Sequence, residues 1–465
     1  MLRALLISYH FPPARTAGAQ RWADFTELAG ERGWEFDVVS FCLDTSEHEF
    51  AKGVRVFGVP HPDHWFSQVR RFVHLIRLKL RDNFGRNGEQ GRDGVAISNS
   101  VGEQIVRRED IRWELSLDCL RRTIYAYQYY TGILPWGRRA ERAARALVET
   151  NRYDVVIASG PPHFAAEIAR RVASKAGLPL IVDFRDPWAQ IDMMQENTAS
   201  PLALILAGRL ERRVISAASL VAMNTALAEK VMRGSYPNTD FITVRNGYNG
   251  DPVLPRHSQQ TFVAAYAGAI YLDRDPRPLL AAVAEVVKTL ELQPTDFQLK
   301  FIGEVDSFGS VPLTHLADLA GVSQYVQVLP SLPKVNLHLE LASAALLVNL
   351  PQGAHLCIPS KVYEYLHFPA WILAMEPEGT ATRQLLESTG TDIVLPYDVS
   401  GIARVLQEKI AAFRTGVRPK PLAQADEFSA RRQAEAFFCA VEHSVLRIPQ
   451  PTSVNCTSFS QELAS

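Results

Sequence analysis

Residues 153–188 read YDVVIASGPPHFAAEIARRVASKAGLPLIVDFRDPW, and this stretch decides the fold class. A short apolar run over 154–158 is followed by a Gly-Pro-Pro turn and then by helical periodicity over 163–176, which Gly177 ends. A second apolar run covers 180–183. Such runs are typical of strands buried on both faces of a parallel sheet. Strand, helix and strand in this order therefore predict a right-handed βαβ unit.

The same alternation continues on both sides of this stretch. In the first 250 residues it predicts further helices over 19–32 and 202–217, and further strands over 3–8, 36–41, 54–59, 220–223 and 241–244. After a polar, Pro-containing linker, more strands are predicted over 262–267, 298–302, 326–329, 344–349, 371–375 and 393–395. Two such α/β series predict two Rossmann-like domains whose parallel sheets face each other across a cleft, with ligands beyond the carboxyl ends of the strands.

The length also favours two domains, because 465 residues exceed what one core usually serves. We predict a first Rossmann-like domain over 1–250, in which about 60–145 form a variable basic insertion, and a second over 258–425. A helix over 426–446 is predicted to pack back on the first domain. The Pro- and Ser-containing tail over 447–465 is predicted to be disordered.

The composition excludes several classes of protein. A net charge of −1 gives no sign of a nucleic-acid partner. The five cysteines are scattered without a CxxC pair, so we expect neither a disulfide framework nor a zinc site, and a reducing cytosol fits best. No apolar run is long enough to span a bilayer. Basic and apolar residues alternate over about 65–81, which fits either peripheral membrane contact or a surface helix packed on its domain.

Two places could hold an anionic ligand. The loop from Phe11 to Arg21 contains Gly18 and joins a strand to a helix, so its backbone N–H groups could face an anion; alternatively, Gly18 only serves a turn. Lys361 and Glu364 lie one helical turn apart after a predicted strand. Lys361 could neutralise a diphosphate and Glu364 could accept hydrogen bonds from ribose hydroxyls, although an exposed salt bridge is the alternative.

Three segments together resemble a known family. They are LLISYHFPPARTAGAQRW over 5–22, the stretch 153–188 quoted above, and IPSKVYEYLHFPAWILAM over 358–375. In this order they resemble glycosyltransferase family 4, the group 1 retaining enzymes of GT-B fold, and in particular a subgroup with SGPPH and DFRDPW motifs. The resemblance covers most of 1–445 and is poor over 60–145.

The resemblance implies a retaining, hexosyltransferase-like enzyme. It would move a sugar from a nucleotide diphosphate donor on the second domain to an acceptor hydroxyl on the first. The acceptor would be a glycan or lipid-linked glycan, in cell-surface polysaccharide synthesis, in the cytoplasm or on the inner face of the membrane. The nucleotide-sugar is a co-substrate, and neither a cofactor nor a metal is expected.

The resemblance also assigns candidate residues. It implies that Glu364 binds the ribose of the donor and that Arg274 binds the donor phosphates. Arg277 is a weaker candidate for the phosphates. Around the first-domain motifs, His163 and Asp186 are the catalytic candidates, and Arg185 and Trp188 are the acceptor-side candidates. Alternative interpretations remain for three of these residues: a water-exposed histidine at a helix start, an ion pair from Arg185 to Asp183 or Asp186, and a tryptophan that fills the core.

The chain also departs from the family pattern. Leu356 stands where many members carry a first glutamate, and Pro369 replaces a usual glycine, so the donor is left open. Two other functions therefore stay possible: a nucleotide-sugar 2-epimerase of the same architecture, and a non-catalytic sugar-nucleotide-binding subunit. A dehydrogenase is disfavoured because no GxGxxG fingerprint is present.

Overall fold

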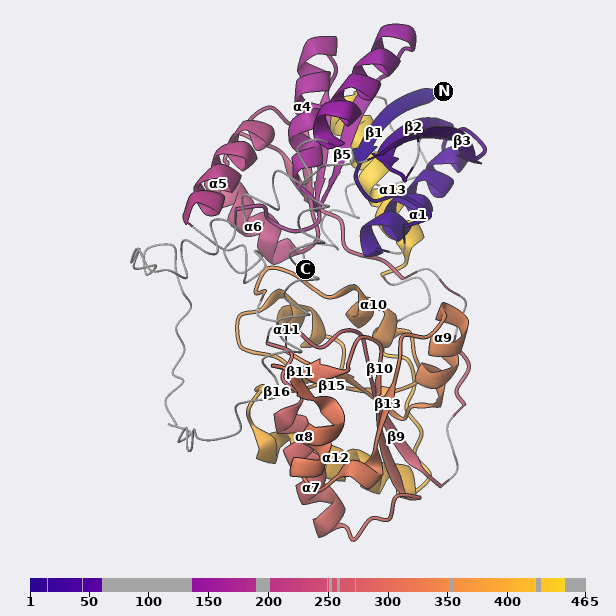
Figure 1. Ribbon diagram of the computed structural model, residues 1–465, viewed down its shortest axis with the longest axis vertical. Coiled ribbons are helices and arrows are strands. Elements are labelled where there is room, and N and C mark those ends of the chain that lie inside the picture. The colour runs from indigo at the N-terminus through magenta and orange to yellow at the C-terminus, as the bar shows by residue number, and fades with distance from the viewer. Residues whose placement is uncertain are drawn as a thin grey trace, which may run out of the picture.

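A computed structural model describes residues 1–14, 16–43, 45–60, 136–189, 201–248, 250, 253–256, 260–271, 273–351, 354–423 and 428–447. The chain forms two lobes, one above the other in Figure 1, and each lobe is built on a parallel sheet. This is the α/β architecture that the strand and helix pattern predicts. The predicted segment at 65–81, and the predicted tail over 447–465 apart from its first residue, lie outside the described residues.

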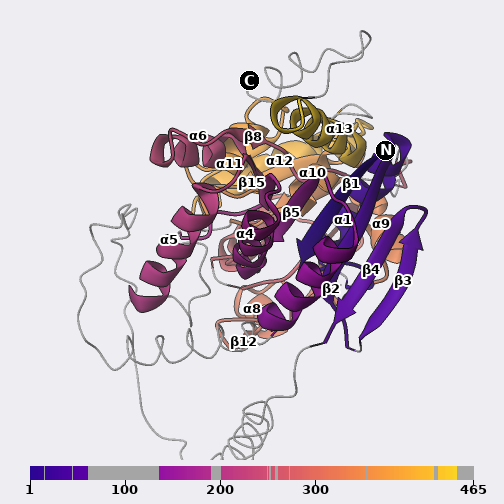
Figure 2. The ribbon, with the colours of Figure 1, turned by 90° about the horizontal axis from the view of Figure 1, so that it is seen from above.

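The first lobe contains an eight-stranded sheet in the order β3-β4-β2-β1-β5-β6-β7-β8. The strands are β1 Leu2–Ser8, β2 Trp34–Phe41, β3 Ser46–Ala51, β4 Val54–Val59, β5 Val155–Gly160, β6 Leu180–Phe184, β7 Leu220–Met223 and β8 Phe241–Thr243. All neighbours are parallel except β3 and β4. The strand pattern did not predict β3, because this exposed edge strand has two glutamates and no apolar run (Figure 2).

Alternate residues of the first-lobe strands enter two different cores. Leu5 and Ile7 of β1 share a core with α4 (Phe164–Ala176), α5 (Pro201–Ile215) and α6 (Ala226–Ser235). Ala4 and Leu6 share the other core with α1 (Ala17–Glu31). Because both faces are covered, the strands appear in the sequence as continuous apolar runs.

The second lobe contains a six-stranded parallel sheet in the order β13-β10-β9-β14-β15-β16. Its strands are β9 Phe262–Ala267, β10 Phe297–Ile302, β13 Val326–Leu329, β14 Leu346–Asn349, β15 Trp371–Met375 and β16 Asp392–Val394. The helices around it are α7 Arg277–Thr289, α8 Leu313–Leu319, α9 Lys334–Ser343, α10 Ser360–Leu366, α11 Ala381–Leu386 and α12 Val399–Arg414. A small hairpin, β11 Ser307–Phe308 with β12 Val311–Pro312, extends from the lobe.

The end of the chain returns to the first lobe. Helix α13 (Ala430–Ala440) contacts α1, and both belong to the upper lobe of Figure 1. Phe437 of α13 meets Trp22 of α1 edge to face, with ring centroids 5.6 Å apart. Beyond α13, Glu442 accepts a hydrogen bond from the Trp34 indole at 2.8 Å and an ion pair from Arg32. The last helix therefore completes the core of the first lobe.

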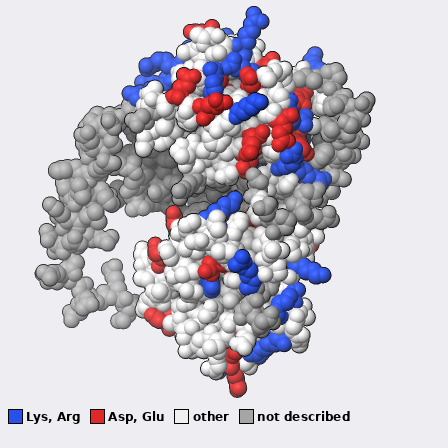
Figure 3. All heavy atoms as spheres, turned by 90° about the vertical axis from the view of Figure 1, so that its right-hand side faces the viewer, with Lys and Arg blue, Asp and Glu red and all other residues white. Residues whose placement is uncertain are grey.

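The surface shows no field of a single sign on the face drawn in Figure 3, where acidic and basic side chains are interspersed. In the part of the chain that the structure describes, no helix combines the length and apolar character that crossing a membrane requires.

Candidate active site

A cavity of about 470 Å³ lies between the lobes, at the carboxyl ends of strands from both sheets. Its size is in the usual range for a small-molecule site. The first lobe lines it with Arg185, Asp186, Asn224 and Asn246. The second lobe lines it with Ala267, Gly268, Tyr271, Arg274, Leu337, Cys357, Ile358, Pro359, Ser360, Lys361, Glu364 and Tyr365.

Lys361 places an unusual buried amine at the wall of this cavity. Its Nζ is shielded from solvent and has no hydrogen-bond acceptor among the described residues. It lies 3.9 Å from the ring centroid of Tyr266 on β9. Burial, and then the nearby Arg274, hold the pKa of the Lys361 amine well below its ordinary value, while Glu376 acts in the opposite direction. Lys361 is not in the exposed salt bridge with Glu364 that the spacing left open.

Arg274 lies beside Lys361 and is almost completely buried. Its guanidinium donates to the Ala269 carbonyl at 2.9 Å and lies over the Tyr271 ring. Arg277 instead pairs with Asp275 at 2.7 Å, is largely exposed and is absent from the cavity lining. Of the two predicted arginines, the structure therefore brings only Arg274 into the site.

Glycines allow the backbone to approach closely at this end of β9. Gly268 has φ of 144° and Gly303 has φ of 128°, values that other residues rarely adopt. A Cβ on Gly303 would lie 2.3 Å from the carbonyl oxygen of Gly268. The loop that carries Ala269 and Arg274 therefore lies against the end of β10 so closely that Gly303 leaves no room for a side chain.

Glu364 reaches the cavity from α10, and His338 of α9 fixes it. His338 Nε2 lies 2.8 Å from Glu364 Oε1, so an N–H at this nitrogen donates to the carboxylate. The second oxygen, Oε2, remains an acceptor in chemical terms. The arrangement can therefore present a carboxylate oxygen to hydroxyl groups in the cavity.

Asp186 faces the second lobe across the cavity. The Cys357 thiol donates to Asp186 Oδ1 at 2.9 Å, and burial raises the pKa of that thiol well above its ordinary value. Close by, the Thr225 hydroxyl donates to the carbonyl of Leu356 at 2.7 Å. These two hydrogen bonds join the lobes directly at the site.

His163 lies behind Asp186 and is not among the residues that line the cavity. Its Nε2 donates to the Asp186 backbone carbonyl at 2.6 Å, and its ring stacks on Trp188 with centroids 5.6 Å apart. Burial lowers the pKa of His163 to about 4. Trp188 is itself buried, with Glu211 accepting from its backbone N–H at 3.0 Å. Both side chains therefore support the Asp186 loop, and the core-filling interpretation holds for Trp188.

Arg185 lines the cavity, whereas Gly18, which lies against Arg185, is not among the lining residues. Arg185 donates to the carbonyls of Gly160 and Pro161 at 3.0 and 3.3 Å, and the described residues show no ion pair from it to Asp183 or Asp186. Asp183 pairs instead with Arg21 of α1 at 3.0 Å. Gly18 lies inside the first turn of α1, where an added Cβ would be 2.6 Å from the Arg185 guanidinium carbon. Gly18 is needed for this approach and does not have the positive φ of a turn glycine.

The sequence analysis missed a polar pair beneath Lys361. Glu376 is fully buried just after β15, and Asn349 ends β14. The Asn349 amide donates to Glu376 Oε1 at 2.6 Å, and the Thr380 hydroxyl donates to the other oxygen at 3.3 Å. Burial raises the pKa of Glu376 to about 8. Their positions at strand ends could have marked both residues, because ligand-binding groups of such sheets gather there.

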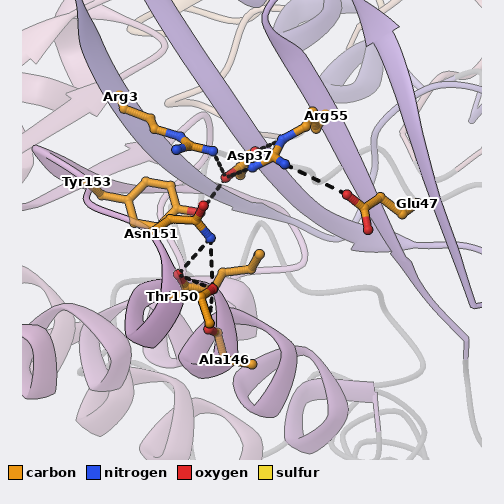
Figure 4. Close-up of polar contacts among 9 residues, drawn as sticks. Arg3, Asp37, Glu47, Arg55, Ala146, Thr150, Asn151 and Tyr153 are labelled. Atoms are coloured by element: carbon orange, nitrogen blue, oxygen red, sulfur yellow. Dashed lines mark hydrogen bonds and ion pairs between the residues drawn. The ribbon is translucent and has the colours of Figure 1, made fainter.

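A second cavity, of about 610 Å³, lies at the opposite end of the first sheet. Asp37 is one of the residues that line it, and Figure 4 shows its carboxylate contacting Arg3, Arg55 and the Tyr153 hydroxyl. The two ion pairs measure 2.8 Å each, and both arginines lie on strands next to that of Asp37. Although this cavity is larger, its charges hold strands together, and the cleft between the lobes is the better candidate site.

The architecture and the cleft define the class of fold, which is GT-B. The solved structures similar to this chain include sucrose-phosphate synthase from Thermosynechococcus elongatus, at 13% identity with a TM-score of 0.58, covering 96% of this chain and 97% of that one. Another is Alr3699/HepE from Anabaena in complex with UDP and glucose, at 13% identity with a TM-score of 0.56, covering 95% and 100%. A third is a proposed UDP-N-acetylglucosamine 2-epimerase from Listeria monocytogenes, at 10% identity with a TM-score of 0.53, covering 98% and 99%.

A sequence profile adds a finding at the level of the domain. Residues 95–247 match the glycosyl transferase 4-like domain, which includes the described strands β5 to β8. A search of the curated proteins gave no sequence match. The GT-B fold predicted from the motifs is therefore confirmed, with a glycosyltransferase-type domain in the first half of the chain.

Proposed function

We propose that this chain is a glycosyltransferase that moves a sugar from a nucleoside diphosphate donor to an acceptor hydroxyl. The observation that carries the proposal is the buried amine of Lys361, which lines the cleft beside Arg274 and has no described acceptor. A lysine amine and an arginine at one wall of a cleft suit a diphosphate, whose negative charge grows as it leaves the sugar. HepE, which has the same fold, was solved with UDP and glucose.

In this proposal the second lobe holds the donor. Lys361 and Arg274 bind the diphosphate, and Glu364, fixed by His338, accepts hydrogen bonds from the ribose. The bond from the sugar C1 to the diphosphate breaks, and its electron pair leaves with the diphosphate. The acceptor oxygen bonds to C1 and loses its proton. Asp186, on the opposite wall, is the proposed partner of that acceptor hydroxyl.

The finer features of the proposal rest on the motif resemblance. We propose a retaining, hexosyltransferase-like enzyme of family 4, in the subgroup with SGPPH and DFRDPW motifs. It would need neither cofactor nor metal, because Lys361 and Arg274 supply the positive charge for the leaving diphosphate. Its acceptor would be a glycan or lipid-linked glycan for the cell surface, used on the cytoplasmic face of the membrane.

Helix α5 supports a peripheral membrane contact in this proposal. It exposes Leu202, Ile205 and Leu206 on one face, followed by Arg209, Arg212 and Arg213. Its single acid, Glu211, is buried. Exposed apolar side chains beside exposed arginines suit an anionic lipid surface.

We expect the α5 double variant Ile205→Ser/Leu206→Ser to co-sediment severalfold less with vesicles containing phosphatidylglycerol. The matched control is Val231→Ser, an exposed apolar residue of α6. Equal binding of both variants would contradict a membrane contact through α5.

The donor site can be tested with a thermal-shift screen of UDP-, GDP-, dTDP- and ADP-sugars, with and without EDTA. A ligand at 100 times its Kd should stabilise the chain by about 2.7 kcal/mol and raise Tm by several degrees. We expect one nucleotide class to do so equally with EDTA, and Glu364→Ala to weaken the shift. Glu285→Ala, an exposed residue of α7, should leave it unchanged.

Product analysis separates the alternatives. A 2-epimerase, the function proposed for the Listeria structure, would convert a bound donor to a new sugar nucleotide without an acceptor. A transferase would leave the donor largely intact until an acceptor glycan is added. A binding subunit would show the thermal shift with no product in either case.

A further inference from the structure

The surroundings of the Lys361 amine provide little stabilisation for a positive charge. The Nζ of Lys361 is excluded from solvent, has no hydrogen-bond acceptor among the described residues, and faces the Tyr266 ring. An ammonium group has three N–H donors, and burying it without acceptors costs several kcal/mol. The aromatic face compensates for only part of this.

The charged groups around Lys361 do not supply the missing acceptors or negative charge. Arg274 adds a second positive charge on the same wall. Glu376 is the neighbouring acid, but its oxygens accept hydrogen bonds from Asn349 and Thr380. Among the described residues, Lys361 Nζ has no hydrogen bond to it. Other titratable groups at or near this cavity are Tyr266, Tyr271, His338, Glu364, Tyr365, Arg185, Asp186 and Cys357.

We propose that Lys361 stands as an uncharged amine in the donor-free protein and takes up a proton when a nucleoside diphosphate binds. The inference rests on the proposed donor site. A bound diphosphate supplies Lys361 with acceptor oxygens and negative charge, which the surrounding protein groups do not provide. The ligand then stabilises the ammonium form of Lys361. Each donor molecule therefore binds together with up to one proton from water.

Two features of the cluster fit this assignment. Burial favours the neutral forms of both Lys361 and Glu376, so a carboxylate is not maintained to hold an ammonium in place. The guanidinium of Arg274, on the same wall, can attract the diphosphate first. Its approach brings the negative charge that draws the proton to Lys361.

The consequence is a pH-dependent affinity with a defined sign. Because binding adds a proton, affinity falls as pH rises, by up to about tenfold per pH unit for one full proton. Above pH 8 a nucleoside diphosphate is itself fully ionised, since the second pKa of a phosphate is about 6. A decrease in that range therefore comes from the protein.

The test is calorimetric titration with UDP, GDP, dTDP and ADP in turn, at pH 8, in buffers of different ionisation enthalpy. The dependence of the observed heat on the buffer gives the number of protons taken up. For the nucleotide that binds, we expect uptake approaching one proton in the wild type and in Glu376→Gln. We expect no uptake in Lys361→Arg, whose guanidinium is always charged, and weaker binding without uptake in Lys361→Met.

Each outcome separates this inference from the proposed function. Binding without proton uptake by the wild type would overturn the inference and leave the donor site standing. Uptake that disappears in Glu376→Gln but persists in Lys361→Arg would assign the proton to Glu376 and overturn it as well. No binding by any of the four nucleotides would overturn the donor site and the inference together.

Discussion

His163 shows at the scale of one residue how burial decides a charge. Sequence position alone left it open between a catalytic histidine and an exposed one. In the fold its ring is enclosed by Trp188 and Phe184, and its Nε2–H supports the carbonyl of Asp186. It is thus a positioning residue that holds Asp186 toward the cleft.

The lowered pKa of His163 gives a testable pH dependence. Its folded pKa of about 4 lies below the ordinary 6.5, so its contribution to stability is present above pH 6.5 and is lost as pH falls toward 4. At pH 5 this loss should be roughly 2 kcal/mol. We expect His163→Gln, which keeps an N–H donor, to lose that much less free energy of unfolding than the wild type between pH 7.5 and 5. Parallel pH profiles in urea denaturation would contradict this assignment.

At the scale of elements, α1 is positioned by one close contact at its first turn. Gly18 lets the Arg185 guanidinium lie against the helix while it donates to the carbonyls after β5. The same helix contains Gly30 near its other end, where an added Cβ meets nothing within 4 Å. The two glycines form a matched pair in one helix.

We expect Gly18→Ala to destabilise the chain by about 1–3 kcal/mol, because the methyl group must displace the hydrogen-bonded, partly buried Arg185. Gly30→Ala should stabilise it by roughly 0.5–1 kcal/mol, since alanine favours the helix. Chemical denaturation of both variants measures the difference. If Gly18→Ala also proved stabilising, the contact with Arg185 would not be a constraint.

The sequence could predict the helices and strands that depend on the residue pattern within a single segment. Apolar runs buried on both faces marked the strands of the two parallel sheets except β3, whose exposed edge carries no such run. The position of Lys361 at the cavity was predictable from its place after a strand, whereas Arg274 followed from the motif resemblance. Partners across long distances, such as His338 for Glu364 and Arg21 for Asp183, were not, because the spacing within one segment does not reveal what another segment brings near.

At the scale of the whole molecule, the C-terminal segment binds the two ends of the chain together. Phe437 is fully buried between Trp22 and Phe25 of α1, and its neighbour Phe438 packs on Trp34. The first lobe therefore depends on residues that follow the entire second lobe in the sequence.

Truncating Phe437 to Ala should cost about 3–5 kcal/mol, because a large cavity would open in the core of the first lobe. We expect calorimetry to show an early transition of the first lobe, with donor-induced stabilisation of the second lobe retained. Glu435→Ala, a partly exposed change on the same helix, is the control and should leave the transitions together. A single, uniformly shifted transition for Phe437→Ala would mean that the two lobes unfold as one unit.

The pairing of Arg32 with Glu442 also affects the order in which the lobes can fold during translation. These residues are 410 positions apart. If the ribosome adds ~5–20 residues per second, the helix that covers the aromatic face of α1 is synthesised ~20–80 s after α1. During that time the second lobe can fold while the first, although made earlier, stays unfinished. The order of completion is the reverse of the order of translation, and the nascent first lobe is the natural place for a chaperone to act.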